Sequence, residues 1–263
     1  MPPSQKRARR YDYVRTRTAV LAQFDSVRSA VASLPPDRLA LPTRLGDWTV
    51  RELAAHLAMA VESVSRCLDL EAPGAQELTL LEWPFATGRV ADRISEDVRA
   101  IAAASTPEEL FARTADRITE RLPGADGERL ITTRVGAMRL CDYLVSRCVE
   151  LVVHTDDLND AAGLEIPYDR QALAACTRLL ADALAAKAPG ASTEVRVPPY
   201  AVVQCVEGPR HTRGTPPNVV ETDPLNWIRL ATGRTRWRTA VAAAQVAASG
   251  ERADLSALLP VMR

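Results

Sequence analysis

Apolar residues recur at helical spacing along the first part of the chain. They predict a helix over residues 11–34, which ends where a Pro-Pro pair cannot continue it. A second helix should begin at Thr49, because Thr49 and Glu52 have the spacing of a capping box, in which each side chain satisfies the other residue's backbone N–H. The apolar pattern of this helix continues to about Leu70.

Further helices are expected after a loop at 71–88 that contains proline and glycine. Helical patterning resumes over 89–121, with a break near the Ser-Thr-Pro at 105–107, where serine or threonine has the features of an N-cap followed by proline at the first helical position. The last helix should cover about 138–161. Four principal helices in about 150 residues predict an antiparallel four-helix bundle.

The remainder of the chain has a mixed pattern. An alanine-rich helix is expected over about 168–187, followed by the short β-like stretches TEVRVP, YAVVQCVEG and PNVVET. Helices should begin near DPLNWIRLATG and RTAVAAAQ, before the short stretches VAASG and ADLSALLP. Because the strands are grouped and do not alternate with helices, we predict an α+β fold. The expected parts are a disordered basic tail at 1–10, the bundle at 11–164 and a small α+β domain at 165–263.

Charge and composition narrow the possible partners and the compartment. Lys+Arg and Asp+Glu are both 33 among 263 residues, so nothing indicates a nucleic-acid partner. The short tail QKRARR could touch nucleic acid or anionic lipid, although a solvated tail is the simpler interpretation. No apolar run is long enough for membrane insertion, and no secretory h-region follows the first charges. Five cysteines without a CxxC pair indicate a reducing, cytoplasmic environment.

A stripe of ionisable residues lies along the helix expected at 138–161. Tyr143, Arg147, Glu150, His154 and Asp157 fall within an arc of about 80° on a helical wheel. One interpretation is a solvated face with ordinary ion pairs. Large aliphatic residues border the stripe on both sides, however, which favours a buried functional site. This helix alone leaves both interpretations open.

The histidine of the second helix bears on that choice. His56 lies on the shoulder of its helix's apolar face, where a satisfied core histidine and a metal ligand are both plausible. Glu150 and His154, four residues apart, can chelate a metal side by side, and a residue from a facing helix completes such a set. Three protein ligands leave an open coordination position, as in catalytic zinc sites. His211, in a loop, is a fourth ligand or a solvated histidine.

Two stretches on these helices carry a family resemblance. LGDWTVRELAAHLA, followed about a hundred residues later by RCVELVVHTDDL, resembles the metal-binding domain of mycothiol-dependent maleylpyruvate isomerases, one of the DinB-like four-helix bundles. The resemblance covers about residues 11–163, and in it His56, Glu150 and His154 match the zinc ligands. The stretch from DPLNWIRLATGRTRW to ADLSALLP is similar to bacterial sterol carrier protein-like domains, which says little about a ligand.

The resemblance implies a zinc- and mycothiol-dependent enzyme. In the isomerase, the thiol binds zinc as a thiolate and adds to the cis double bond of maleylpyruvate; rotation and elimination then give fumarylpyruvate. Zinc would keep the thiol ionised near neutral pH, where a free thiol with a pKa of about 8.5 is mostly protonated. Relatives with the same ligands are S-transferases. The implied activity is therefore isomerisation of, or thiol transfer to, an electrophilic small molecule.

A carboxylate-bearing substrate would need cationic partners. Arg147 is the first candidate for both substrate and thiol binding, because it shares the face of Glu150 and arginine binds carboxylates through two parallel hydrogen bonds. Arg229 and Arg234 of the second domain are weaker candidates that could close over the site. An ordinary surface ion pair remains an alternative for each of the three.

Three more residues next to the site have expected roles. Asp157, one turn after His154, could orient that imidazole, whereas Asp156 should be solvated. Trp48 is expected to wall the thiol-binding pocket or to be a core residue. The alternative to an enzyme is a non-catalytic protein that binds a lipid-like or small ligand in its second domain, with the bundle as a scaffold around a structural or vestigial metal site.

Overall fold

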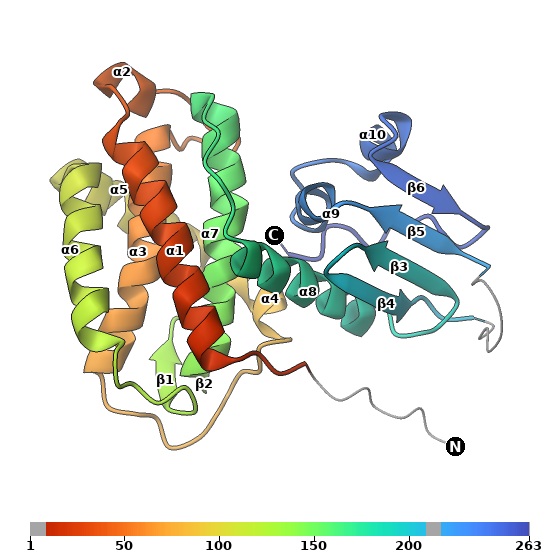
Figure 1. The fold of residues 1–263 in the computed structure, drawn as a ribbon, viewed down its shortest axis with the longest axis horizontal. Coiled ribbons are helices and arrows are strands. Elements are labelled where there is room, and N and C mark those ends of the chain that lie inside the picture. Colours follow the sequence, from red (N-terminus) through yellow and green to blue (C-terminus); the bar gives the residue numbers. More distant parts are fainter. Residues whose placement is uncertain (1–8, 209–216, 263) are drawn as a thin grey trace.

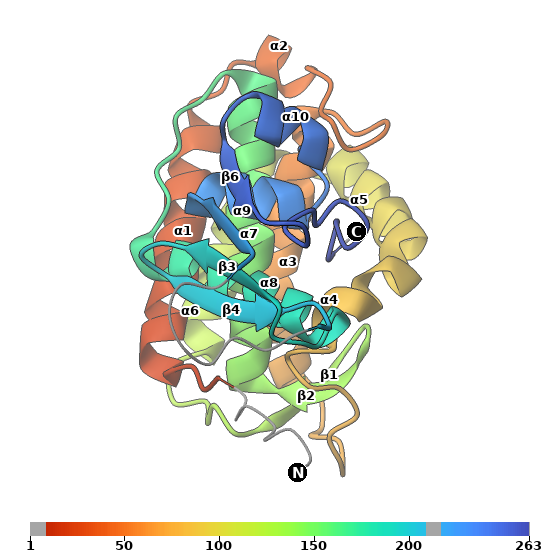
Figure 2. The ribbon, with the colours of Figure 1, turned by 90° about the vertical axis from the view of Figure 1, so that its right-hand side faces the viewer.

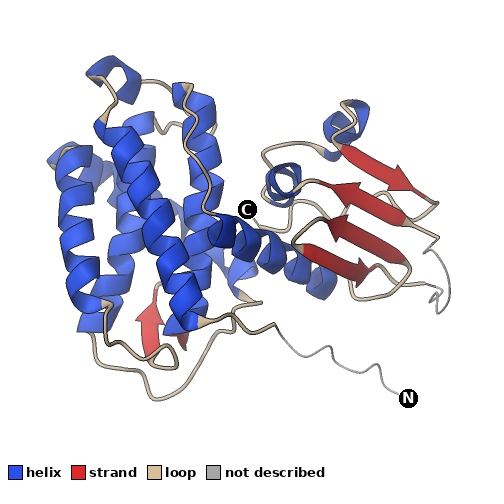
Figure 3. Cartoon of the chain, in the orientation of Figure 1, coloured by secondary structure: helices blue, strands red, loops and turns tan. Residues whose placement is uncertain are grey.

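The computed structural model describes residues 9–208 and 217–262. Figure 1 shows a bundle of long helices next to a smaller part that contains a sheet, and Figure 3 shows helices on one side and most strands on the other. The α+β class predicted from the sequence is confirmed. Residues 1–8 of the expected tail and His211 lie outside the described residues; Arg9, next in the chain, pairs with Asp182 at 2.9 Å.

Four long helices form the bundle. They are α1 (Tyr13–Ala32), α3 (Val50–Asp69), α6 (Pro107–Arg121) and α7 (Leu140–Ala162). Helices α1 and α3 each contact both α6 and α7, which closes the four-helix ring (Figure 1). The remaining helical elements of this part are α2 (Pro36–Leu39), α4 (Trp83–Ala86), the 3₁₀ turn η1 (Thr87–Val90) and α5 (Ala91–Ala104). The predicted four-helix bundle is confirmed, with α5 packed on α3 as an addition.

Local capping residues define where the bundle helices begin and end. Thr49 and Glu52 form the predicted capping box at the start of α3, and Thr106 caps α6 with proline at its first position. Helix α7 ends at Gly163, whose positive φ of 61° is the left-handed conformation that a residue with a Cβ adopts only with strain. The ends of the helices therefore follow from residues next to them in the sequence.

A small hairpin precedes α7 and was not expected. Strands β1 (Leu130–Thr133) and β2 (Gly136–Arg139) pair in antiparallel register. Ala137 of β2 accepts backbone hydrogen bonds from Glu77 and Leu78 at 2.9 and 3.0 Å, and its own N–H donates to the Glu77 carboxylate at 2.9 Å. The hairpin thereby holds the long loop that follows α3, and that loop leads into the buried Trp83.

The second part consists of a four-stranded sheet with helices. The sheet has the order β4-β3-β5-β6, with β3 and β5 parallel and the outer pairs antiparallel. The strands are β3 (Thr193–Val197), β4 (Ala201–Cys205), β5 (Val219–Thr222) and β6 (Val246–Ser249). The helices are α8 (Arg170–Lys187), α9 (Pro224–Ala231) and α10 (Trp237–Ala242). The predicted strands and helices of this part are thus present.

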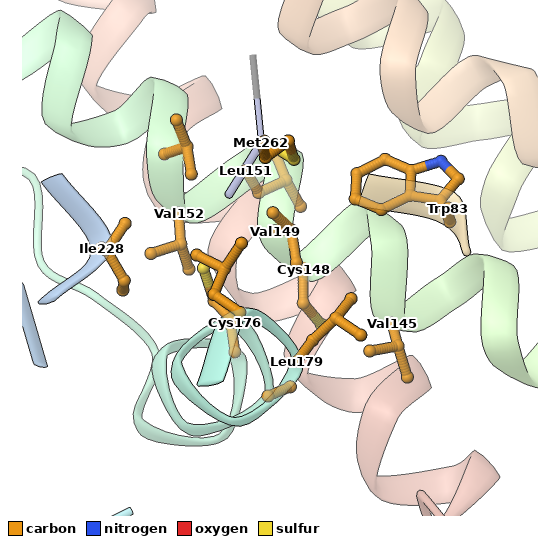
Figure 4. Close-up of a cluster of buried hydrophobic side chains, with 14 of the residues drawn as sticks. Trp83, Val145, Cys148, Val149, Leu151, Val152, Cys176, Leu179, Ile228 and Met262 are labelled. Atoms are coloured by element: carbon orange, nitrogen blue, oxygen red, sulfur yellow. The ribbon is translucent and has the colours of Figure 1, made fainter. Parts of the chain in front are cut away.

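Helix α8 packs on both parts of the chain. It contacts α1 and α7 of the bundle and also β4 and α9 (Figures 1 and 2). Figure 4 shows Val149 and Val152 of α7 in one apolar cluster with Cys176 of α8 and Ile228 of α9. Because burial of one such aliphatic side chain contributes about 1.5–3 kcal/mol, this shared core holds the second part firmly against α7. Among the described residues, no helix is long and apolar enough to cross a membrane.

Candidate metal centre

Three side chains converge in the middle of the bundle. His56 comes from α3, and Glu150 and His154 lie one turn apart on α7. One possible ligand atom from each residue lies within 4.8 Å of the others. The Glu150 Oε2 atom is 3.2 Å from His56 Nε2 and 3.3 Å from His154 Nε2. The residues that were predicted to bind a metal are thus brought together.

The polar stripe on α7 is buried. Helix α7 packs against α1, α3 and α8, so that neighbours surround it on several sides. Arg147 is 7 % exposed and Asp157 is 0 % exposed, and the side chain of Glu150 is 15 % exposed. His56 is 6 % exposed on α3. The interpretation of the stripe as a solvated face is therefore wrong, because the other helices cover it.

The hydrogen bonds within the cluster keep its carboxylate ionised. Burial lowers the pKa of His56 below its ordinary value, despite a hydrogen bond with Glu150. Burial opposes the charge of Glu150, but hydrogen bonds to both histidines and the Arg147 charge hold the pKa of its carboxyl well below 4.5. Burial also opposes protonation of His154, but hydrogen bonds to Asp157 and Glu150 raise its pKa above 6.5. One ionised carboxylate thus faces two imidazoles away from bulk water.

The donor set suits zinc or a similar divalent ion. Two imidazole nitrogens and one carboxylate oxygen are typical zinc ligands, and three protein ligands leave one position for water or another ligand. His154 Nδ1 lies 2.8 Å from Asp157 Oδ2, so the neutral imidazole with its proton on Nδ1 would donate to this carboxylate and offer the Nε2 lone pair to a metal. His56 Nδ1 has no hydrogen-bond partner within the described part of the chain, and its ring centroid lies 5.2 Å from that of Trp48.

A cavity of about 70 Å³ adjoins the cluster, and His56 and Glu150 are part of its wall. Its other polar or aromatic lining residues include Ser63, Trp83, Arg134, Tyr143 and Arg147. The Tyr143 hydroxyl and Ser63 Oγ are 2.6 Å apart. Tyr143 is on the predicted stripe but was not singled out. Trp83 begins helix α4, inside the stretch 71–88 that was predicted as a loop and for which the sequence indicated no role. Only a lone Trp-Pro pair marks that loop position.

Arg147 is a buried cation in the wall of this cavity. Its guanidinium donates to the Ala60 carbonyl at 3.3 Å and to Ser146 Oγ at 3.1 and 3.2 Å, which are neutral acceptors. The nearest carboxylate oxygen belongs to Glu150, at 3.7 Å. The guanidinium carbon lies 4.4 Å from the centroid of the Tyr143 ring. The alternative of a surface ion pair is therefore excluded for Arg147, since this side chain is buried.

The two arginines of the second part contact aspartates of α7. Arg229 Nη2 lies 2.6 Å from Asp156 Oδ1, and Arg234 Nη2 lies 2.8 Å from Asp157 Oδ2. Neither arginine is among the residues that line the cavity. The prediction that Asp156 is solvated is wrong: it is 3 % exposed, because the second part of the chain covers that side of α7. Trp48 is half-buried and donates its indole N–H to Ser95 Oγ at 3.1 Å.

Comparisons with known proteins match both parts of the chain. Residues 20–159 match the model of the mycothiol maleylpyruvate isomerase N-terminal domain, and residues 169–261 match that of the bacterial SCP ortholog. Solved structures of the mycothiol-dependent maleylpyruvate isomerase and of a mutant of it are similar in fold. Each has 16 % sequence identity and a TM-score of 0.59, over 93 % of this chain and 95 % of the other. Among curated proteins, none matches the sequence.

Proposed function

The chain belongs to the family of the mycothiol maleylpyruvate isomerase N-terminal domain, and from this premise we propose that it is a metal- and thiol-dependent enzyme. Its metal would be zinc, its thiol mycothiol, and its substrate a small electrophilic molecule that carries a carboxylate. The reaction would be cis–trans isomerisation or transfer of the thiol to the substrate. The observation that carries the proposal is the convergence of His56, Glu150 and His154 beside a cavity with a buried arginine in its wall.

His56, Glu150 and His154 would hold the metal. When bound, zinc lowers the pKa of a thiol in its open position from about 8.5, so that the sulfur is nucleophilic near neutral pH. The burial of the three ligands keeps competing water away from the site. Asp157 would keep the proton of His154 on Nδ1, because its Oδ2 accepts from that nitrogen at 2.8 Å.

Arg147 would bind the carboxylate of the substrate. Its charge is buried among neutral acceptors, and the nearby Glu150 would be committed to the metal. Because Glu150 would share its charge between Arg147 and the metal, a second anionic group in the cavity would offset more of the cost of burying the Arg147 charge. The Tyr143–Ser63 pair offers a further hydroxyl in the same wall, and Trp83 supplies an apolar surface that excludes water.

Contacts of Trp48, Arg229 and Arg234 with thiol or substrate stay predictions. Trp48 lies next to the His56 ring, whereas the two arginines are engaged with aspartates of α7. The non-catalytic, lipid-binding alternative is not favoured. The cavity described above lies in the bundle beside the metal ligands, and its wall carries charged groups that a lipid tail would leave unpaired.

Two measurements on the full chain test the proposal. Elemental analysis of purified protein should find about one zinc per chain, and the His56→Ala variant should lose it. Calorimetric titration should show that mycothiol binds the zinc-loaded protein more tightly than the metal-stripped protein. The proposal would be contradicted if the wild-type chain bound no metal, or if mycothiol bound the zinc-loaded and metal-stripped proteins with equal affinity. Turnover of maleylpyruvate, compared with an uncharged electrophile, would then separate isomerase from transferase.

A further inference from the structure

Asp157 connects the candidate metal centre to the second part of the chain. Its carboxylate is 0 % exposed. Oδ2 accepts a hydrogen bond from His154 Nδ1 at 2.8 Å and another from Arg234 Nη2 at 2.8 Å. Oδ1 accepts from Arg234 Nε at 3.2 Å and lies 2.8 Å from Arg44 Nε. Arg234 therefore grips both oxygens of the carboxylate that contacts a predicted metal ligand.

The backbone after α9 aims Arg234 at α7. Gly233 has a positive φ of 75°, which lets the chain reverse direction directly after the helix. The Arg234 backbone N–H donates to the Arg229 carbonyl at 2.7 Å, and its Nη1 donates to the Thr232 carbonyl at 2.9 Å. The Arg234 side chain is only 13 % exposed. Its guanidinium is thus held from both sides, and this limits where the Asp157 carboxylate can move.

A neighbouring ion pair provides an internal comparison. Arg229, which lies in α9 itself, contacts Asp156 with Nη2 at 2.6 Å from Oδ1 and Nε at 3.0 Å from Oδ2. The other described side-chain partners of Asp156 are Arg44 and Tyr168, neither of which is a predicted metal ligand. Two consecutive aspartates of α7 are therefore clamped in the same way by two arginines of the second part. Only one of the two contacts leads on to His154.

We propose that Arg234 is a positioning residue for the metal centre, which acts on His154 through Asp157. An imidazole that binds a metal through one nitrogen is oriented by the acceptor of its other N–H, and that acceptor works best when it is itself fixed. Arg44 contacts only Oδ1 of Asp157, whereas Arg234 donates to both oxygens and so fixes the plane of the carboxylate. The second part of the chain would thereby complete the metal centre without contributing a ligand. This inference rests on the proposed metal binding.

The test compares metal affinity among matched variants of the full chain. Zn²⁺ dissociation constants are measured by competition with a chromophoric chelator, and the Co²⁺ form is followed by its visible absorption. Arg234→Gln should weaken Zn²⁺ binding by about 10- to 100-fold and alter the Co²⁺ spectrum. Arg229→Gln also loses an ion pair between the two parts, yet it should leave both readouts close to wild type. Arg234→Lys keeps the charge but cannot donate to both carboxylate oxygens with the same geometry. Its Zn²⁺ dissociation constant should lie between those of wild type and Arg234→Gln.

A double substitution tests the route through Asp157. In an Asp157→Ala background, Arg234→Gln should cause no further loss of Zn²⁺ affinity, because the intermediary is already absent. Equal losses in the Arg234 and Arg229 variants would overturn the inference in favour of a general docking effect, as would an unchanged Arg234→Gln protein. Should Arg234→Gln not fold, Arg234→Lys is compared with wild type, alone and in the Asp157→Ala background, and the same outcomes decide. A wild-type chain that binds no metal would overturn the proposed function and this inference together.

Discussion

Metal binding should raise the thermal stability of the whole chain. The fold brings His56 together with Glu150 and His154, which lie far from it in the sequence, so zinc should bind the folded state more tightly than the unfolded chain. At free zinc 100-fold above the dissociation constant, the folded state gains about 2.7 kcal/mol. Unfolding 263 residues carries an entropy of about 0.55 kcal/mol per kelvin at about 2.1 cal/mol/K per residue. The melting temperature should therefore rise by about 5 °C.

The core shared by α7, α8 and α9 justifies treating unfolding as one transition. Five cysteines, all buried and free in the folded chain, become exposed on unfolding and can bind some zinc there. That competition makes the figure of about 5 °C an upper value. Zinc binding to the unfolded chain would lower the melting temperature of every variant by a similar amount, so differences in melting temperature between variants remain interpretable.

The assay is differential scanning calorimetry of metal-stripped protein over a zinc titration, with a reductant present. Wild type should show a melting temperature that rises with the logarithm of free zinc, and His56→Ala and Glu150→Gln should lose most of the rise. His211→Ala shows in the same assay whether the third histidine, which the sequence left open as a fourth ligand, contributes to the rise. A flat wild-type response, or equal shifts in wild type and His56→Ala, would refute the assignment of these residues as the metal ligands.

Three further predictions concern the cavity, the metal site and the shared core. Arg147→Gln should raise KM for a carboxylate substrate by about 10- to 100-fold, since a hydrogen bond to a charged group is worth about 1.5–3 kcal/mol, and steady-state kinetics should show little change for an uncharged electrophile. Zinc affinity should fall as the pH drops through the raised pKa of His154, because the metal binds only the unprotonated imidazole. Below that pKa, calorimetry in buffers of different ionisation enthalpy should detect the release of about one proton for each zinc bound. Ile228 of α9 is 1 % exposed and lies beside Val152 of α7. Ile228→Ala should lower the free energy of unfolding, measured by urea titration, by about 2–5 kcal/mol. A change in zinc affinity in this variant would argue against separate roles for the core and the metal site.

Local signals in the sequence were sufficient for the helices and for two of the three metal-ligand candidates. The capping box at Thr49 and the cap at Thr106 form hydrogen bonds with backbone groups three residues away, so no distant contact is needed to define where these helices begin. Glu150 and His154 are adjacent on α7 because four residues make about one helical turn. His56 on the facing helix completed the proposed ligand set, although its place on the shoulder of the apolar face also fitted a core histidine, and the family motifs then matched it.

The hairpin and the cavity wall depended on contacts between distant segments. The hairpin at β1 and β2 is too short for its alternation to stand out, and it is held by hydrogen bonds to Glu77, more than fifty residues earlier. Trp83 reaches the cavity from the four-residue helix α4, which is too short to show a periodic pattern and follows an irregular loop. Periodicity predicts which side of a helix is apolar, but an irregular loop has no such period. Its side chains are placed only by what the loop packs against.

Asp156 and Asp157 show most clearly which properties follow from the sequence and which follow from the tertiary structure. The sequence by itself determined that these aspartates lie on different sides of α7 and that Asp157 is one turn from His154, because the geometry of a helix is the same wherever it lies. Only the tertiary structure decided that both are buried and that each is held by an arginine more than seventy residues away. Those contacts depend on how α9 docks beside α7, which is set by the shape of the shared core and not by any pattern local to either helix.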